Sequence, residues 1–348
     1  MAAAYAHELH LAELAVLRAS ILTKKVLSSV SGISKADASP VTVADFAAQA
    51  ILISALLNAF PDDAFVGEED SAALRSDEAL RSRVYELASS AHLENQDDEA
   101  LLASPSSVEE MLDLIDLGGR GQGGSTGRFW VMDPVDGTAT FLRGEQFAVS
   151  LALIDDGREV VGVLGCPNLK PVDGTVAETT VDRDGLGLML SAVHNQGATI
   201  REMTNGGLEA ARPLEGLAKA SDHADVRIVD CSTSKTSRHD VVGKLASSFG
   251  ATFPNTEIWS SHIRYAALMV GGGDFQLRIP SSPDVKMWIW DHAGAQLILT
   301  EAGGKVTDLD GKTMDFGAGR DLNQNRGLVA ARGDIHATVL ERLGQIMS

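Results

Sequence analysis

A short apolar segment that runs directly into a pair of aspartates constrains this chain more than any other feature. Phe129-Trp130-Val131-Met132 has the composition of a buried strand, and Asp133-Pro134-Val135-Asp136-Gly137-Thr138 follows it without a break. The acidic side chains therefore stand at the carboxyl end of a strand, which is where α/β proteins usually place their ligands. The segment predicts a functional turn at the edge of a sheet.

The turn after this strand combines oxygen ligands for a metal ion with N–H groups that can donate hydrogen bonds to a phosphate. Asp133 and Asp136 are three residues apart around a proline, so both carboxylates and the Val135 carbonyl can converge on one point. Such ligands suit a hard cation such as Mg²⁺. Gly137 and Thr138 begin a short helical turn, whose free backbone N–H groups can receive a phosphate. The same dipeptides also occur in plain turns, so this stretch alone leaves a purely structural role open.

The spacing of the two aspartates also separates two kinds of phosphatase chemistry. Phosphatases that form a covalent aspartyl intermediate carry Asp-x-Asp-Gly-Thr, whereas here two residues separate Asp133 from Asp136. The longer gap places the second acid on a different face. It therefore favours attack by water that a metal activates over attack by a carboxylate.

Two further acidic segments are candidate partners of this turn. Gly67-Glu68-Glu69-Asp70 follows the apolar pair Phe65-Val66, so we expect a strand that ends in an acidic loop, although such a loop is more often only solvated. Asp291 precedes an apolar helical pattern that ends at Gly303-Gly304. We therefore expect Asp291 at or near the N-cap of a helix, where it can cap the helix, bind a metal or do both.

The remaining pattern predicts helices and strands without an internal repeat. We expect one amphipathic helix over residues 8–30 and a second that opens at Asp45 and ends before Pro61, with Pro40 stopping any helix between them. The mixture indicates an α/β or α+β fold of layered helices and sheets. The other expected elements are exposed helices with loops over 71–116, a mobile glycine-rich loop over 118–127, strands at 147–154, 160–164, 186–192, 226–229 and 274–278, and helices from Ser261 and Asp291.

Length and charge bound the organisation of the chain and its partners. At 348 residues the chain exceeds the size at which one core usually stops growing, so we expect two domains, residues 1–168 and residues 169–348. The net charge of −19 argues against binding a nucleic-acid polymer. Cys166 and Cys231 lack the spacing of a zinc site or a disulfide framework, and no run of about 18 apolar residues is present to span a membrane. We expect a monomeric cytoplasmic protein without a membrane partner.

Three motifs occur in the order and with the spacing of one phosphatase superfamily. Gly67-Glu68-Glu69, the turn from Asp133 to Thr138, and Trp290-Asp291-His292-Ala293-Gly294 together resemble the lithium-sensitive, magnesium-dependent phosphatases, which include inositol monophosphatase and fructose-1,6-bisphosphatase. Finer segments resemble one branch, the 3′(2′),5′-bisphosphate nucleotidases of fungi and plants. These segments are Ser39-Pro40-Val41-Thr42 leading to Asp45, Phe60-Pro61-Asp62-Asp63, Gly127-Arg128-Phe129-Trp130, residues 141–149 and Gly165-Cys166-Pro167-Asn168-Leu169.

The resemblance implies a fold and a metal site. The implied fold is a layered αβαβα sandwich of two domains, of which the first carries most of the metal ligands. Asp45 and Thr138 would orient the attacking water as the catalytic pair, and Gly137 with Thr138 would bind the phosphate. Inhibition by Li⁺, which would replace one Mg²⁺, is a further expectation. The implied ligands of two or three Mg²⁺ ions are Glu68, Asp133, the Val135 carbonyl, Asp136 and Asp291.

The resemblance also implies a nucleotide end of the site, in the second domain with Asp291. Its residues are His239, Ser261, Arg264 and Arg278. Arginine suits a second phosphate because its planar fork binds two oxygens, although each arginine could instead form an ordinary surface ion pair. A lone histidine such as His239 is commonly structural.

The implied activity is removal of the 3′-phosphate from adenosine 3′,5′-bisphosphate to give AMP, with possible action on 3′-phosphoadenosine 5′-phosphosulfate. This small-molecule reaction would clear a by-product of sulfate assimilation. Ala139-Thr140 stands where this branch often carries Lys-Gly, so any role of that lysine is absent. Two alternatives stay open: an inositol polyphosphate 1-phosphatase or inositol monophosphatase, and a catalytically silent nucleotide or metal sensor.

Overall fold

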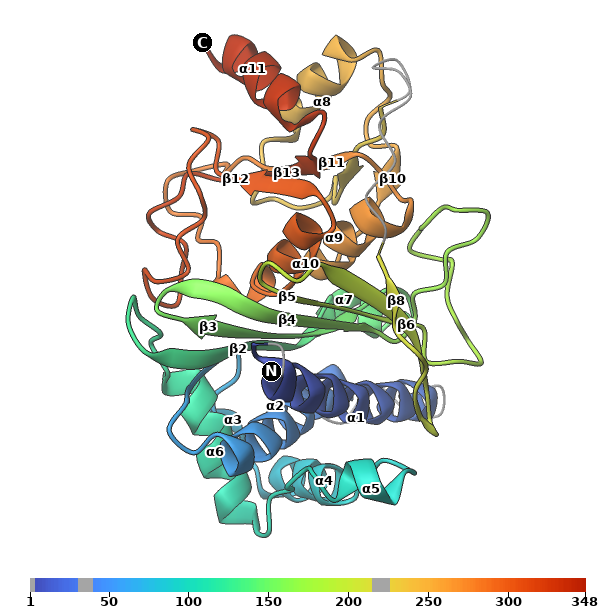
Figure 1. The fold of residues 1–348 in the computed structure, drawn as a ribbon, viewed down its shortest axis with the longest axis vertical. Helices are drawn as coiled ribbons and strands as arrows, with labels where there is room; N and C mark the ends of the chain where they lie inside the picture. The colour runs from blue at the N-terminus through green and yellow to red at the C-terminus, as the bar shows by residue number, and fades with distance from the viewer. Residues whose placement is uncertain (1–3, 31–39, 215–225) are drawn as a thin grey trace.

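The computed structural model describes residues 4–30, 40–214 and 226–348 of the chain. Helices and sheets alternate in layers, with helices on both faces of the main sheet and a smaller sheet above them (Figure 1). The expected layered αβαβα arrangement is therefore confirmed. From the N-terminal layer upward, the main helices are α1 (Ala6–Val30), α2 (Pro40–Ala59), α9 (Ser261–Val270), α10 (Ala295–Glu301), α8 (His239–Ser248) and α11 (His336–Met347).

The main sheet has eight strands, and its central strands are buried on both faces. β1 pairs with β2 in parallel, and every other neighbouring pair is antiparallel. Central strands that are apolar at successive positions can be buried only because helices cover both faces. The strands are β1 (Ala64–Gly67), β2 (Arg128–Asp136), β3 (Ala148–Asp155), β4 (Arg158–Cys166), β5 (Leu188–Val193), β6 (Ala198–Thr204), β7 (Gly207–Leu208) and β8 (Arg212–Pro213).

Two smaller sheets form the upper part of the molecule. One is antiparallel, with the order β11-β13-β12, and the other pairs β9 with β10 in parallel. The strand expected at 226–229 is shorter and later than predicted, because only Val229 and Asp230 join a ladder. These strands are β9 (Val229–Asp230), β10 (Thr256–Glu257), β11 (Phe275–Arg278), β12 (Gly304–Thr307) and β13 (Leu328–Arg332).

Short helices fill the stretch between β1 and β2, as predicted, but the last one extends into the expected glycine-rich loop. α6 continues to Arg120 because its glycines pack where no side chain fits. A Cβ atom on Gly118 would lie 2.9 Å from Gln49 Nε2, and one on Gly119 would lie 2.4 Å from the Glu69 carbonyl. These glycines therefore hold α6 against the acidic loop after β1. The helices are α3 (Ala72–Ser76), α4 (Glu78–Ser89), α5 (Gln96–Glu99) and α6 (Val108–Arg120).

The start of α2 differs from the prediction. Pro40 was expected to stop a helix and Asp45 to open the next one, yet α2 begins at Pro40 and contains Asp45. Proline is compatible with the first helical position, because the N–H group that it lacks has no partner there. The earlier start places Asp45 within a helix that packs against β2.

Three clusters of buried apolar side chains hold the layers together. The first joins α1 and α2 to the lower face of the main sheet, the second joins α9 and α10 to its upper face, and the third joins α8 and α11 to the small sheet. The expected domain boundary after residue 168 stays a prediction. β4 and β5, which flank it, pair within the main sheet.

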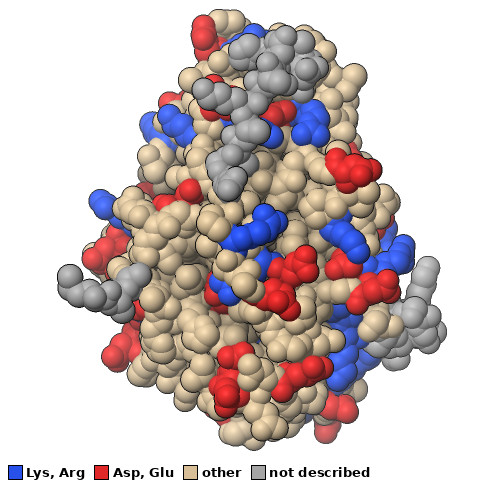
Figure 2. All heavy atoms as spheres, turned by 45° about the vertical axis from the view of Figure 1, so that its right-hand side comes forward, with Lys and Arg blue, Asp and Glu red and all other residues tan. Residues whose placement is uncertain are grey.

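The surface charge and the lengths of the helices relate to the predicted partners of the chain. On the face shown in Figure 2, Lys and Arg side chains are interspersed with Asp and Glu. Among the residues that the structure describes, no helix is both long enough and apolar enough to cross a bilayer. The expected cytoplasmic location, the monomeric state and the absence of a nucleic-acid partner stay predictions.

Candidate metal and phosphate site

An irregularity in β2 turns two aspartates toward the same side of the sheet. Asp133 pairs with Ser150 on β3, and the next pair joins Asp136 to Ala148, so β2 carries an extra residue between the two pairs. Side chains three apart on a regular strand point to opposite faces, and a bulge reverses the second one. Pro134 is tolerated because a bulge leaves its position out of the ladder. The motif therefore folds into a bulge that gathers its acids.

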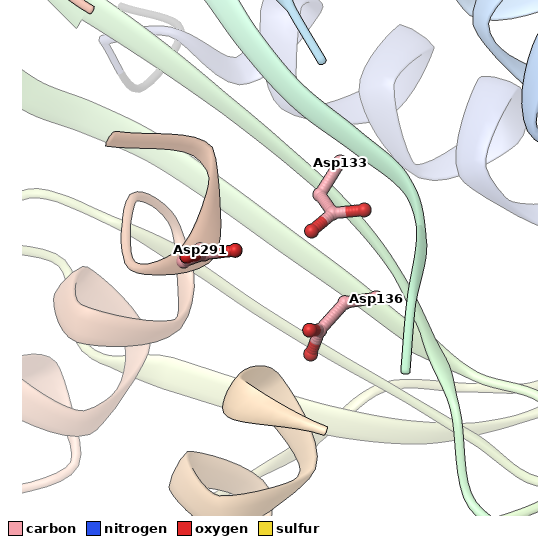
Figure 3. Close-up of side chains that lie close together, drawn as sticks. All are labelled: Asp133, Asp136 and Asp291. Carbon is pink, nitrogen blue, oxygen red and sulfur yellow. The ribbon is translucent and has the colours of Figure 1, made fainter. Parts of the chain in front are cut away.

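Asp133, Asp136 and Asp291 form the centre of the site. Each offers a carboxylate oxygen, and these oxygens lie within 4.8 Å of one another, with Asp291 approaching from the other side of the gap (Figure 3). Asp133 is 2% exposed, and its Oδ1 has no hydrogen-bond partner. We refer to these three residues as the aspartate cluster.

Burial and mutual repulsion disfavour the charged state of this cluster. Burial, followed by the charges of Glu68, Asp136 and Asp291, raises the pKa of Asp133 well above its ordinary value. Burial and the charge of Asp136 raise the pKa of Asp291 to about 7, although Arg278 acts in the opposite direction. Carboxylates crowded in this way take up protons unless a cation is present.

The cluster fits a divalent cation. Its donors are all carboxylate oxygens, one of them buried and without a partner, and such a set is typical of hard cations such as Mg²⁺. A bound cation would reverse the electrostatics of the cluster, since it would favour the ionised carboxylates. Within the described residues, this is the only group of three or more acidic, histidine or cysteine side chains with ligand atoms so close together.

Two more acidic residues border the cluster. Glu68, directly after β1, lies outside the group of three and is exposed as a residue, but its carboxyl shares a hydrogen bond with Asp133. Desolvation and the charges of Glu69 and Asp136 raise the pKa of Glu68 to about 7. Asp45 is buried on α2, its Oδ1 has no partner, and burial together with Glu69 and Glu68 raises its pKa well above the ordinary value. Both residues therefore share the electrostatic field of the cluster.

The predicted phosphate turn follows the cluster directly. Gly137 has a φ of 99° and stands before the short helix α7 (Thr138–Phe141). A Cβ atom there would lie 2.8 Å from Thr140 Oγ1 and 3.0 Å from Ser260 Cβ, so the position requires glycine. Thr138 is exposed, and no hydrogen bond joins it to Asp45 within the described part of the chain. Val135 is buried inside the bulge, and its role as a carbonyl ligand stays a prediction.

Asp136 has a second role that the sequence did not reveal. Its carboxylate accepts hydrogen bonds from the N–H of His262 at 2.6 Å, the N–H of Ser261 at 3.2 Å and the hydroxyl of Ser260. Ser260 in turn caps α9 by accepting from the N–H of Ile263. Asp136 therefore fixes the start of α9 beside the cluster.

Asp291 lies near the N-cap of a helix, as predicted, but does not itself begin that helix. It ends a 3₁₀ turn, η2 (Ile289–Asp291), and α10 begins only at Ala295, because Gly294 has a φ of 84°. The N–H of Gly294 donates to Glu159 on β4 at 3.0 Å, and Ser150 on β3 donates to the Ala293 carbonyl at 3.2 Å. Two strands thus hold the segment that carries Asp291. Sequence reasoning missed Glu159 and Ser150, and their positions gave no local signal.

The two predicted arginines of the nucleotide end have different surroundings. Arg264 donates from Nε to Gln276, from one terminal nitrogen to the carbonyls of Ile258 and Trp259, and from the other to Ser261 Oγ at 3.1 Å. The protein itself therefore uses most of its donors. Arg278 has a buried Nε without a partner, and burial lowers its pKa.

His239, the first residue of α8, contacts Asp230 and the loop that follows it. Its Nδ1 is 2.9 Å from an Asp230 carboxylate oxygen, and its Nε2 is 2.7 Å from the Ser234 carbonyl. Both ring nitrogens thus have protein partners, an arrangement typical of a structural histidine. Its predicted contact with a nucleotide stays a prediction.

Comparisons with known proteins agree with this geometry. The family described as "Inositol monophosphatase family" matches residues 2–348. A 3′(2′),5′-bisphosphate nucleotidase of Emericella nidulans is 38% identical over 351 residues, which are 99% of each chain, and one of Schizosaccharomyces pombe is 40% identical over 98% of this chain and 96% of its own. One of Oryza sativa is 35% identical over 97% of this chain and 93% of its own.

Solved structures show the same fold at low sequence identity. An inositol monophosphatase of Anabaena (Nostoc) matches with a TM-score of 0.58 at 17% identity, over 97% of this chain and 96% of its own. Inositol monophosphatase-II of Staphylococcus aureus matches with a TM-score of 0.57 at 18% identity, over 95% of this chain and 91% of its own.

Proposed function

Because this chain belongs to the inositol monophosphatase family, we propose that it is a magnesium-dependent phosphomonoesterase that hydrolyses the 3′-phosphate of adenosine 3′,5′-bisphosphate to AMP and phosphate. The family is metal-dependent. The observation that carries the proposal is the aspartate cluster, whose three carboxylate oxygens lie within 4.8 Å of one another. Relatives over the whole length of the chain are named for this bisphosphate activity.

The residues that would hold the cations surround the bulge of β2. When bound, such ions supply positive charge to phosphoryl oxygens and acidify a water molecule. The raised pKa values of Asp133 and Asp291 support this assignment, because burial and neighbouring carboxylates disfavour their charged forms unless a cation binds. The proposed ligands of two or three Mg²⁺ ions are Glu68, Asp133, the Val135 carbonyl, Asp136 and Asp291.

Asp45 and Thr138 form the proposed catalytic pair. A threonine hydroxyl that donates to a carboxylate can accept a hydrogen bond from the attacking water and so orient it. The unpartnered Oδ1 of Asp45 supports this role, since a buried carboxylate oxygen is available for such a bond. The backbone N–H groups of Gly137 and Thr138 would receive the phosphate next to Asp136. Ala139-Thr140 supplies no lysine to this turn.

The basic end of the site would receive the second phosphate. Arg278 suits this role because its Nε has no protein partner and its positive charge opposes the rise in the pKa of Asp291. Ser261 and Arg264 would shape this end. Action on 3′-phosphoadenosine 5′-phosphosulfate would follow from the same recognition of a 5′-phosphate.

Phosphate release from three substrates tests this proposal. Purified protein is given adenosine 3′,5′-bisphosphate, inositol 1,4-bisphosphate or inositol monophosphate, with Mg²⁺ or with EDTA. We expect the adenosine bisphosphate to be hydrolysed with the highest kcat/KM, the activity to disappear in EDTA, and millimolar Li⁺ to inhibit it. Faster turnover of an inositol phosphate would favour the inositol phosphatase alternative, and no turnover of any substrate with Mg²⁺ would favour a silent sensor.

A further inference from the structure

A small cavity lies beside Arg278, the predicted second-phosphate residue. It has a volume of about 30 Å³, and Arg264, Gln276, Arg278 and His292 are among its lining residues. Gln276 and Arg278 are two residues apart on β11, so their side chains leave the same face of the strand. A larger cavity, of about 1000 Å³, lies between the loops at 279–287 and 309–326 and contains no residue of the aspartate cluster.

Gln276 lines this cavity and is buried, and only one end of its side-chain amide has a hydrogen-bond partner. The residue is 3% exposed, and its Oε1 accepts a hydrogen bond from Arg264 Nε at 3.0 Å. Its Nε2 is buried and has no hydrogen-bond partner. Buried amide donors almost always have a partner, so an unpartnered one needs a reason.

Two more nitrogen atoms of the lining residues share this property, whereas the donors of Arg264 are bonded to the protein. Arg278 Nε and His292 Nε2 are also buried and unpartnered. Asp230 is the one acidic side chain among the described residues that line the cavity, and it is already engaged by His239 and by the N–H of Cys231. The lining therefore combines an unused amide donor with the cation of Arg278, and its one carboxylate is already bonded, which is an arrangement that suits an anion.

The size of the cavity limits what can enter. A water-sized group needs roughly 10–15 Å³ of such volume, so there is room for about two of them. The terminal oxygens of a phosphoryl group fit this space, whereas a nucleobase or a sugar does not.

We propose that Gln276 is a specificity-determining residue, whose Nε2–H donates to the phosphoryl group that is not hydrolysed, beside Arg278. Its Oε1 meanwhile holds Arg264 in place. This inference rests on the proposed function, because it assigns Gln276 to the second phosphate of a bisphosphorylated nucleotide. Together with Arg278, Gln276 would separate substrates with that phosphate from substrates without it.

A pair of substrates that differ only in the second phosphate tests the inference. Gln276→Glu keeps an acceptor for Arg264 but replaces the Nε2 donor with an oxygen. We expect its kcat/KM on adenosine 3′,5′-bisphosphate to fall about tenfold or more, mainly through KM, while that on adenosine 3′-phosphate changes by less than about threefold. Gln276→Met, which removes the donor without adding charge, should show the same selectivity and serves if the first variant fails to fold.

A matched control and a binding measurement complete the test. Gln345→Glu adds the same charge on the exposed side of α11 and should leave both substrates unaffected. Calorimetric titration with AMP in EDTA measures the phosphate contact without turnover, and we expect weaker binding to both Gln276 variants. Equal losses on the two substrates, or unchanged AMP binding, would overturn the inference. A wild-type protein that hydrolyses neither substrate would instead contradict the proposed function.

Discussion

The two ends of the candidate site have opposite electrostatic defects. At the aspartate cluster, carboxylates crowd together and burial raises the pKa of Asp133 and Asp291. At the other end, burial lowers the pKa of Arg278, whose Nε has no partner. Arg278 partly offsets the charge of Asp291, but burial disfavours the charged form of the groups at each end. Cations at the first end and an anion at the second would satisfy both, and a bisphosphorylated substrate with Mg²⁺ supplies that combination.

We expect the largest effect on turnover from one substitution in the aspartate cluster, the acidic end of the site. Asp136→Asn removes a charge from the cluster but keeps an oxygen that accepts from the N–H of His262. We expect turnover to fall by on the order of 10²–10³-fold, with the protein still folded, because a proposed metal ligand is lost. Phosphate release and thermal unfolding are the measurements.

A second substitution at the same position separates chemistry from folding. Asp136→Ala also removes the hydrogen bonds that Ser260, Ser261 and His262 donate, so we expect it to destabilise the fold by about 1–2 kcal/mol in addition. Near-normal turnover in Asp136→Asn would refute the metal assignment.

The basic end should respond to the loss of its unpartnered cation, and the effect should depend on the substrate. We expect Arg278→Met to lower kcat/KM on adenosine 3′,5′-bisphosphate by about 10–100-fold and to change that on adenosine 3′-phosphate far less, because only the first substrate carries the second phosphate. Arg326→Met is a matched control, since Arg326 forms an exposed ion pair with Asp310. Equal losses on both substrates would show that Arg278 supports the fold instead.

Removal of metal should affect the stability of the acidic end, which the melting temperature measures. If the cluster repels itself without cations, Mg²⁺ should raise the melting temperature of the wild-type protein, and Asp133→Asn should reduce that gain. In EDTA, we expect Asp133→Asn to melt about 1–2 °C above the wild type, as about 1 kcal/mol would produce in a chain of this size. Calorimetry in EDTA and in Mg²⁺ measures both values. A variant that melts below the wild type in EDTA would contradict the repulsion.

The smallest effect on stability is expected at Glu159, which accepts a hydrogen bond from the segment that carries Asp291. Burial raises the pKa of Glu159 to about 8, so its carboxyl is mainly protonated near pH 7. Glu159→Gln keeps an acceptor for the N–H of Gly294, and we expect a change below about 1 kcal/mol at neutral pH.

The stability difference between the wild type and Glu159→Gln should change with pH in a defined direction. A carboxyl whose folded pKa exceeds its unfolded value stabilises the fold fully below the unfolded pKa, and that contribution is lost as pH rises through the folded pKa. The stability of the wild type relative to Glu159→Gln should therefore decrease from pH 5 to pH 8.5. Denaturant unfolding of both proteins across this range measures the difference, and a constant difference would contradict a buried neutral carboxyl.

Much of the acidic end could be predicted from the sequence because its chemistry is local. Asp133, Asp136 and Gly137 lie within five consecutive residues, and the bulge that aligns them is the ordinary response of a strand to an internal proline. The prediction for Asp291 was less accurate. The position of its segment depends on Glu159, which is 135 residues distant from Gly294 in the chain.

The basic end could not be divided into roles from the sequence. Arg264 and Arg278 are the same residue type in similar apolar surroundings, and their difference arises from hydrogen bonds to residues on other elements. Gln276 had no signal at all, because a single glutamine in a strand forms no pattern. His239 likewise acquired its partners only in the folded chain.

The sequence by itself determined the layered mixture of helices and strands, the ligand type at the bulge and the phosphatase family, because these depend on residues that are adjacent or regularly spaced. Only the tertiary structure decided which carboxylates meet, which arginine keeps an unused donor and which buried groups hold the loops. Those properties depend on contacts between residues far apart in the chain, where burial and hydrogen bonding act on whichever groups the fold brings together.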